Sequence, residues 1–476
     1  MPLLDTEFGR LHGRRAGGAT VFENIPYATA PRFAPPGEVR GWTGVREATA
    51  PGPAAPQPWR PAAAFTHGET PVTSEQCLSL NVYTPGLDGA RPVLVWLHGG
   101  GFTIGHAGAS LYSGEQLAVN ADAVVVTVNY RLGSLGWLAH PGLAARPGDP
   151  SANWGLLDQI AALEWVRDHI AEFGGAANRV TLAGQSAGAL CTLDLLVAPG
   201  ARPLFQRAVV QSPPLGDVAQ PAAAGVRWAQ ALSAAAGGRS TFDVSHLREL
   251  EAERVVALHE ELLEQPEFRG TRGGALPTID PASLPNSPLE LPGASPEVDV
   301  LIGHTADEGT FFFDSPWRPA PPPERVPAIV AHLCPDEDPR ELLDRYHGDL
   351  VAIATDAIVA APLARWAGDR AGAGGRVYRY RVDHPGAGPQ LRATHTAEVP
   401  LLFETWRDGG PGERLGGQAA GVADVARELG GAWTAFLHGD SPGWDPVLAG
   451  ESDHVLGVFG GLGAASIESA QPALTK

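Results

Sequence analysis

Short, continuously apolar segments alternate with helix-forming segments along much of this chain, and this alternation restricts the fold more than any other feature. Pro92–Leu97 and Ala123–Val128 are two such apolar runs, both rich in β-branched residues. A strand that is apolar at every position is covered on both faces, as in a parallel sheet with helices on each side. The pattern predicts an α/β fold with a mostly parallel, doubly wound central sheet. Ligands of such sheets bind beyond the carboxyl ends of the strands.

Further elements continue the alternation. Apolar residues recur every three or four positions in Ser151–Phe173, which predicts an amphipathic helix. A late helical stretch around Ala419–Leu437 is compatible with closing the core or with packing on a partner, so the oligomeric state stays open. The sequence also predicts strands over 179–183, 208–211, 298–302 and 377–382, and a helix over 187–197.

No internal repeat and no long linker divides the 476 residues. We therefore expect one domain that spans residues 1–476. Two proline-rich segments, 51–66 and 316–323, are predicted to be ordered surface loops inserted into that domain.

Charge and lysine content exclude several classes of function. The chain has 34 basic and 53 acidic residues and a net charge of −19, whereas a nucleic-acid-binding protein needs a basic surface. The only lysine is the last residue, Lys476. No internal lysine can therefore serve as a P-loop lysine, a kinase lysine, a Schiff base or a pyridoxal-phosphate anchor. We expect no nucleic-acid partner and none of these reactions.

Cysteine usage and the lengths of apolar runs bear on location. Cys77, Cys191 and Cys334 lie far apart and have no metal-binding or disulfide-framework spacing, which favours buried or idle thiols in a reducing compartment. Residues Met1–Gly13 lack the pattern of a signal peptide, and we find no run of about 20 apolar residues that would span a membrane. We expect a cytoplasmic protein without a membrane partner.

The pattern G-x-S-x-G is typical of a tight turn between a strand and a helix that exposes a nucleophilic serine, and the chain contains it twice. Gly184–Gly188 (GQSAG) follows a predicted strand and opens a predicted helix. Gly439–Gly443 (GDSPG) follows a helical stretch instead. Its Pro442 also lacks the backbone N–H that the residue after the nucleophile must donate. We therefore predict that Ser186 is a nucleophile and that Ser441 belongs to a turn.

A glycine-rich segment, His98–Phe102 (HGGGF), directly follows the predicted strand Pro92–Leu97. Consecutive glycines let backbone N–H groups approach an oxygen on which negative charge develops, and such donors each stabilise a transition state by ~3–4 kcal/mol. The N–H groups of Gly100, Gly101 and Ala187 are predicted to form this oxyanion hole. The alternative is a flexible glycine turn without that role.

Several blocks together resemble the type-B carboxylesterase family of α/β-hydrolases, which includes cholinesterases and bacterial para-nitrobenzyl esterases. The similarity runs from about Gly9 to Trp444 and implies the α/β-hydrolase fold for nearly the whole chain. The similar segments are Ile25–Ala28 (IPYA), Glu75–Tyr83 (EQCLSLNVY), Asn129–Gly133 (NYRLG), Asn153–Gln159 (NWGLLDQ) and Phe173–Gly188 around the nucleophile.

The resemblance also implies the rest of a catalytic triad, in which the acid and then the histidine follow the serine. Gly303–Gly309 (GHTADEG) is similar to the family's G-x-x-x-D-E-G, which implies Glu308 as the acid. Asp307 is the alternative, although an aspartate in a turn also shapes the loop by accepting backbone hydrogen bonds. His395–Phe403 (HTAEVPLLF) is similar to H-x-x-E-x-P-x-x-F, which implies His395 as the base. The other histidines after Glu308 are expected on the surface: His332, His347, His384, His438 and His454.

These residue types define a reaction. Serine needs a neutral imidazole to take its proton, and a carboxylate on the other ring nitrogen fixes the tautomer. We predict a serine carboxylesterase that cleaves small to medium neutral esters through an acyl-enzyme on Ser186, without a metal or an organic cofactor. Hydrolysis of carbamates or aryl amides by the same triad is the alternative. Catalytically silent adhesion relatives lack a triad residue, and this chain has all three.

Two positions depart from or extend the family pattern. Gln185 precedes the nucleophile where cholinesterase-like members often carry Glu, which weakens the case for cationic choline esters. Ser212, in Val209–Pro213 (VVQSP), is similar to a family serine that supports the triad hydrogen bonds. We therefore name Gln185 and Ser212 as supporting candidates. Aromatic candidates for the substrate pocket are Phe102, Trp137, Phe312 and Phe403, with a role as ordinary core residues as the alternative for each.

Overall fold

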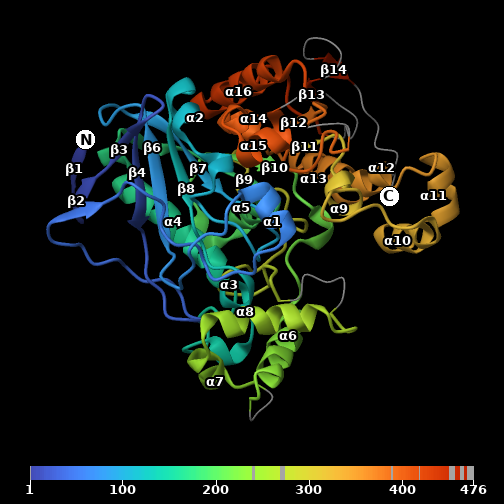
Figure 1. Cartoon of the computed structure of the whole chain (residues 1–476), viewed down its shortest axis with the longest axis horizontal. Coiled ribbons are helices and arrows are strands. Elements are labelled where there is room, and N and C mark those ends of the chain that lie inside the picture. The colour runs from blue at the N-terminus through green and yellow to red at the C-terminus, as the bar shows by residue number, and fades with distance from the viewer. Residues whose placement is uncertain are drawn as a thin grey trace.

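The computed structural model describes residues 2–238, 242–268, 274–386, 390–417, 419–449, 456–460 and 466–468. Within these residues, an eleven-stranded sheet lies at the centre, in the order β14-β13-β12-β11-β10-β9-β7-β8-β6-β4-β3 (Figure 1). The parallel strands are β8 (Val124–Val128), β7 (Arg91–Leu97), β9 (Gly175–Gln185), β10 (Arg207–Gln211), β11 (Asp299–Thr305), β12 (Val377–Val382) and β13 (Leu456–Phe459). Antiparallel strands flank them: β6 (Ser79–Thr84), β4 (Ala19–Pro26), β3 (Arg14–Ala16) and β14 (Ser466–Glu468). A second, three-stranded sheet contains β1 (Leu3–Thr6), β2 (Gly9–His12) and β5 (Val45–Glu47).

Both faces of the central sheet are covered, as the continuously apolar strands predict. Along β7, Val93 and Val95 enter one hydrophobic core, while Leu94 and Trp96 enter the core on the opposite face. The first core is closed by α4 (Trp154–His169), α5 (Ala187–Val197) and α13 (Ala361–Gly372). The second is closed by α2 (Glu115–Asn120), α14 (Val399–Phe403) and α16 (Val422–His438). The predicted doubly wound sheet is therefore confirmed, and the late helix α16 packs on it.

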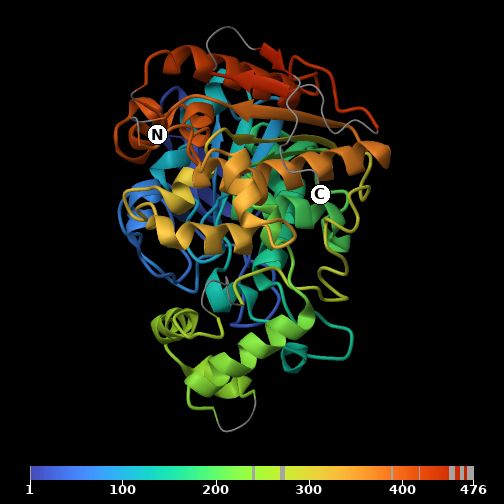
Figure 2. The same cartoon turned by 90° about the vertical axis from the view of Figure 1, so that its right-hand side faces the viewer.

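Two groups of helices extend away from the sheet. Helices α6 (Ala222–Ala235), α7 (Val244–Glu249) and α8 (Ala252–Leu263) lie below it in Figures 1 and 2 and pack with α3 (Gly133–Trp137) around a core of their own. Helices α10 (Val326–Leu333), α11 (Pro339–Arg345) and α12 (Leu350–Thr355) form a smaller apolar cluster at another side. Two further short helices are α9 (Gly309–Phe313) and α15 (Gly410–Gly412).

Helix α4 differs from a simple amphipathic helix because two of its polar side chains, Asp158 and Gln159, are also buried. Asp158 accepts hydrogen bonds from Nε and Nη2 of Arg131 at 2.8 and 2.7 Å, and from the Arg131 backbone N–H at 3.1 Å. A buried charge needs such a partner, because an unpaired one carries a large desolvation cost. The pair connects the end of β8 to α4 beneath the sheet.

Helix α1 (Pro61–His67) lies inside a segment that the sequence predicts to be a loop. The prediction is wrong at this end because Pro61 occupies the first turn of the helix, where proline is well tolerated, and three alanines follow it. The helix matters for the site, since Thr66 and His67 at its end contact the pocket described below.

One helical stretch, Leu350–Gly372, has the length and apolar composition of a membrane span. The sequence does not predict a membrane span here, because Asp356, Pro362 and Arg365 interrupt the apolar run. Within its most apolar window, 61 % of the stretch is buried inside the protein, as in a core helix. Its end, α13, packs against the central sheet.

Candidate active site

Ser186 occupies a strained turn between β9 and α5. Its backbone has φ 58° and ψ −120°, a combination that a residue with a side chain adopts only when its surroundings enforce it. Close packing enforces it here. A Cβ added to Gly188 would lie 2.1 Å from the carbonyl oxygen of Leu97, so only glycine lets α5 approach β7 this closely. The turn leaves Ser186 partly exposed between buried neighbours.

The predicted oxyanion-hole donors lie on the two segments that meet at this turn. Gly100 has φ +120°, and a Cβ there would lie 2.1 Å from the carbonyl oxygen of Ile104, so the loop after β7 requires glycine. Within the described part of the chain, the N–H groups of Gly100 and Gly101 have no protein acceptor. Ala187 is the first residue of α5, where backbone N–H groups have no partner inside the helix. These free donors can face a developing negative charge.

Glu308 and His395 form a buried pair at the ends of neighbouring strands. Glu308 follows β11 and His395 follows β12, and Oε2 of the glutamate contacts Nδ1 of the imidazole. The other glutamate oxygen accepts a hydrogen bond of 2.8 Å from the backbone N–H of Thr305. Burial alone would raise the pKa of Glu308. The charge of His395 and hydrogen bonds from His395 and Ser212 outweigh burial and lower the pKa instead.

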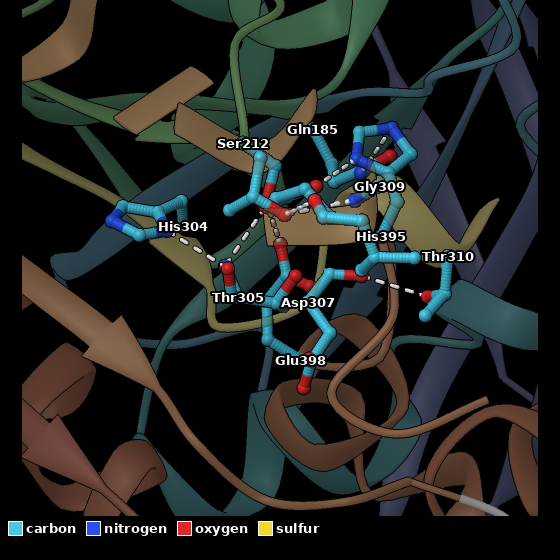
Figure 3. A network of polar contacts seen from close by, with 12 residues as sticks. Gln185, Ser212, His304, Thr305, Asp307, Gly309, Thr310, His395 and Glu398 are labelled. Carbon is cyan, nitrogen blue, oxygen red and sulfur yellow. Dashed lines mark hydrogen bonds and ion pairs between the residues drawn. The ribbon is translucent and has the colours of Figure 1, made fainter. Parts of the chain in front are cut away.

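The second nitrogen of His395 faces Gln185. The side-chain amide nitrogen of Gln185 lies 3.1 Å from Nε2 of His395, and Figure 3 shows the amide beside the ring. An amide N–H at Nε2 and a carboxylate at Nδ1 together require the tautomer with its proton on Nδ1. In that tautomer Nε2 carries a lone pair, and the amide N–H of Gln185 donates to it. Sequence reasoning did not foresee this contact, because nothing in the G-x-S-x-G pattern states where the second residue points.

A second buried glutamate, Glu398, shares Ser212 with Glu308. The hydroxyl of Ser212 lies 3.2 Å from Oε1 of Glu398, and Figure 3 shows the two side chains together. The same hydroxyl also hydrogen-bonds to Glu308. The other oxygen of Glu398 has no partner among the described residues. Burial, followed by the negative charge of Glu308, raises the pKa of Glu398 to about 8. Ser212 therefore lies between an ionised carboxylate and a carboxyl group that holds its proton at neutral pH.

The structure also locates the alternatives to the predicted triad. Asp307 does not contact His395; its carboxylate accepts a hydrogen bond of 3.2 Å from the backbone N–H of Ala393 and so shapes the loop before His395. Ser441 lies in a turn after α16, where its hydroxyl donates to the carbonyl of Trp444 at 2.8 Å.

The prediction that the other late histidines lie on the surface is wrong for His384. Its ring is buried and hydrogen-bonds to the carbonyl of Gly416 at 3.3 Å. His332, His347 and His438 are exposed, and His454 lies outside the described residues.

Ser186 and His395 line a pocket of about 430 Å³. Of the predicted aromatic residues, Phe312 lines it and so does its neighbour Phe311, with ring centroids 5.2 and 5.3 Å from that of His395. The other apolar residues of the wall come from segments far apart in the sequence: Trp96, Ile104, Leu111, Tyr112, Leu263 and Val399.

Three aromatic predictions are wrong. Phe102 is fully buried and packs on the ring of Trp137, with centroids 5.0 Å apart, so both belong to the core beneath the glycine loop. Phe403 is also fully buried and lies behind Trp96, with centroids 4.9 Å apart. Trp96 therefore lines the pocket in place of Phe403. The sequence could have predicted this, because Trp96 is the penultimate residue of the strand before HGGGF and the carboxyl ends of parallel strands face the ligand.

Among the described residues, no group of three or more His, Cys, Asp or Glu side chains is placed to hold a metal ion.

A strained serine at the end of a central parallel strand, with a buried glutamate just after a second strand and a buried histidine in the segment that follows a third, is the arrangement of the α/β-hydrolase class. A model of the carboxylesterase family matches residues 1–326, and the chain belongs to this family.

Individual relatives agree with this assignment. The chain is 35 % identical to the phenmedipham hydrolase of Pseudarthrobacter oxydans, over 97 % of this chain and 96 % of the relative. It is 32 % identical to the para-nitrobenzyl esterase of Bacillus subtilis (strain 168), over 94 % and 91 %. A solved structure of a PNB esterase superposes with a TM-score of 0.83 at 29 % identity, over 96 % of this chain and 95 % of that one. The chain is a carboxylic ester hydrolase.

Proposed function

We propose that Ser186, His395 and Glu308 form the catalytic triad of a serine esterase, with the N–H groups of Gly100, Gly101 and Ala187 as its oxyanion hole. The observation that carries the proposal is the buried His395–Glu308 pair, whose imidazole presents Nε2 beside the pocket that Ser186 lines. In the reaction, the Ser186 hydroxyl takes the place of the Gln185 amide at Nε2. His395 then accepts the serine proton as Oγ attacks the ester carbonyl.

The remaining steps use the same groups. The tetrahedral oxyanion accepts hydrogen bonds from the loop after β7 and from the start of α5, and the positive end of the α5 helix dipole adds to them. His395 gives its proton to the leaving alcohol, which departs and leaves an acyl group on Ser186. Water then enters, His395 removes a proton from it, and the hydroxide attacks the acyl carbon and releases the acid.

The pocket supports a substrate class. Its mostly apolar wall and volume of about 430 Å³ suit acyl groups of small to medium length without charge. Gln185 carries no charge at the position beside the nucleophile, so nothing there attracts a cationic alcohol.

Hydrolysis of p-nitrophenyl acetate, butyrate and octanoate tests the triad. We expect the wild type to release a burst of nitrophenol from butyrate, and Ser186→Ala to lose at least about 10⁴-fold in kcat. Ser441→Ala is the matched control, because it removes the other serine of a G-x-S-x-G segment, and it should keep wild-type rates. Full activity of Ser186→Ala would overturn the proposal. Carbamate and anilide probes with the same acyl or leaving groups would then show whether a different bond is preferred.

We also propose a cytoplasmic location and a single folding unit. Cys77, Cys191 and Cys334 are all free and buried, as suits a reducing compartment. The central sheet combines strands from β3 near the start of the chain with β14 near its end, which supports one domain. Labelling with a thiol reagent before and after denaturation tests whether the three cysteines are free and buried. We expect three modified thiols only after denaturation.

A further inference from the structure

The wall of the active-site pocket has a charge distribution opposite to that of the whole chain. The protein carries a net charge of −19, yet the described wall contains two arginines, Arg60 and Arg318, and no aspartate or glutamate. A cationic wall inside an acidic protein attracts an anionic group and repels a cationic one.

The two arginines differ in what they already bind. Nε of Arg60 donates to Glu260 of α8 at 2.8 Å, and this ion pair uses its charge within the protein. Arg318 is exposed and has no carboxylate within ion-pair distance among the described residues. Its one polar contact there is a long hydrogen bond of 3.5 Å from Nη1 to the carbonyl of Phe312. Most of the five guanidinium donors of Arg318 therefore remain available to a ligand.

The backbone that carries Arg318 is fixed although its side chain is exposed. Ser315 and Arg318 exchange two backbone hydrogen bonds of 2.9 and 3.0 Å, and the hydroxyl of Ser315 donates to the carbonyl of Phe311 at 3.1 Å. The intervening Trp317 packs between Phe311 and Phe65, with centroid distances of 4.9 and 4.5 Å. A fixed backbone reduces the entropy lost when the side chain binds an anion.

The contacts of this loop show on which side of the pocket the charge of Arg318 lies. Phe311 and Phe312 pack on the ring of His395, and Arg318 returns to the carbonyl of Phe312. His395 is the group that protonates the leaving alcohol in the proposed reaction. Arg318 therefore lies on the His395 side of the pocket, which is the side that the proposed reaction assigns to the leaving group.

We propose that Arg318 is a specificity-determining residue that binds a carboxylate on the leaving alcohol. The favoured substrates are then esters whose alcohol or phenol part carries a carboxylate. A guanidinium matches a carboxylate in geometry and can form two parallel hydrogen bonds with it. The inference rests on the proposed esterase activity and refines the prediction of neutral esters: neutral esters remain substrates, and a carboxylate on the leaving group raises kcat/KM.

A matched pair of probes tests this inference: para-(butanoyloxy)phenylacetate and its primary amide, para-(butanoyloxy)phenylacetamide. The two have the same acyl group and shape, and the methylene keeps the acidity of the two phenols similar, so they differ mainly in charge. We expect the wild type to favour the carboxylate about two- to fivefold in kcat/KM, chiefly through KM, since exposed charge pairs have modest strength. Added salt should reduce this preference.

Three variants separate the explanations. The quantity to compare is kcat/KM for the carboxylate probe divided by kcat/KM for the amide probe. In Arg318→Gln this preference ratio should fall to one or below, because the acidic protein then repels the anion. Arg318→Lys keeps the charge and should retain part of the preference. Arg427→Gln removes one positive charge from exposed α16, outside the pocket wall, and should leave the ratio unchanged. Thermal unfolding of each variant checks that the fold is intact.

The outcomes distinguish this inference from the proposed function. An equal ratio in wild type and Arg318→Gln, or a wild type that prefers the amide, overturns the role of Arg318 while the esterase proposal stands. Activity of Ser186→Ala on both probes overturns the esterase proposal itself. If Arg318→Gln does not fold, Arg318→Lys and the salt dependence decide instead. A preference ratio in Arg318→Lys equal to that of the wild type, together with no effect of salt on the ratio, would overturn the inference.

Discussion

Glu308 and Glu398 lie on either side of the Ser212 hydroxyl, both fully buried, and their surroundings drive them to opposite protonation states. Glu308 receives hydrogen bonds from His395, Ser212 and the N–H of Thr305, and its pKa is lowered despite burial. Burial raises the pKa of Glu398 to about 8, and the negative charge of Glu308 adds to this rise, with Ser212 as the shared side-chain partner. Burial alone does not decide the charge of a carboxyl group; hydrogen-bond donors and neighbouring charges can outweigh it, as they do at Glu308.

The largest effect should come from Glu308→Gln, which removes the charge from the ionised member of the pair. The amide cannot hold the proton of His395 on Nδ1 and stabilise the imidazolium, so kcat should fall by about 10⁴-fold. Steady-state hydrolysis of p-nitrophenyl butyrate measures this. Asp307→Asn is the control, because it alters the adjacent carboxylate that contacts the loop and not the ring, and it should cost less than about tenfold. Equal losses in the two variants would contradict the assignment of the acid.

An intermediate effect is expected from Ser212→Ala, which removes the hydroxyl shared by both glutamates. Glu308 loses one of the donors that lower its pKa, and hydrogen bonds to charged groups are among the stronger ones in proteins. We expect kcat to fall about tenfold with little change in KM, because the pocket wall is untouched. A tenfold rise in KM at constant kcat would instead place Ser212 in substrate binding.

The pH dependence of stability should distinguish the two glutamates by sign. The pKa of Glu398 is about 8 in the folded protein against an ordinary value of 4.5, so the folded state binds one more proton between these values. Its contribution to stability is fully present below pH 4.5 and is lost as the pH rises to about 8. Glu308 has a lowered pKa, so its contribution is present above its ordinary pKa and is lost as the pH falls through the folded value.

Chemical denaturation of wild type and Glu398→Gln across this range measures the difference. The variant cannot ionise at this position, so the free energy of unfolding of the wild type should fall relative to that of Glu398→Gln as the pH rises from 4.5 to about 8. A constant difference over the range would show that Glu398 is ionised throughout. In that case the comparison of the two carboxyl groups would fail.

The smallest effect is expected for the activity of Glu398→Gln at neutral pH. Glutamine is close in shape to a protonated glutamate and keeps a donor, its amide N–H, for the oxygen of Ser212, so kcat should change less than about threefold. The assay is the same nitrophenyl ester hydrolysis, run beside Glu308→Gln. A loss approaching that of Glu308→Gln would mean that Glu398 carries a charge that the reaction needs.

Local patterns were sufficient to predict the sheet and the approximate position of the site. The strands β7, β8, β10 and β12 follow the apolar runs closely, and Ser186, Glu308 and His395 all follow parallel strands, as their motifs imply. Their catalytic roles stay predictions. Parallel strands are apolar throughout and end in short turns, so both features leave a clear trace in the sequence.

The pocket wall was less predictable because it depends on side-chain direction. Phe102 and Phe403 adjoin the predicted catalytic motifs yet are buried in the core, whereas Trp96 and Tyr112 line the pocket. Glu308 and Glu398 share the Ser212 hydroxyl although they lie 90 residues apart in the sequence. Their opposite protonation states depend on the geometry of three-dimensional contacts, which no local pattern encodes.

Several residues of the pocket wall belong to segments that are not part of the central sheet. Leu263 ends α8 in the helical group below the sheet, Phe312 belongs to α9 and Arg318 to the turn after it, whereas Ser186 directly follows β9. In the proposed reaction these wall residues are separable from the triad, although Glu308 immediately precedes α9. Exchanging residues 311–318 or the end of α8 between members of the family should therefore produce enzymes with altered substrate ranges and an unaltered reaction, which makes these two segments natural starting points for directed evolution.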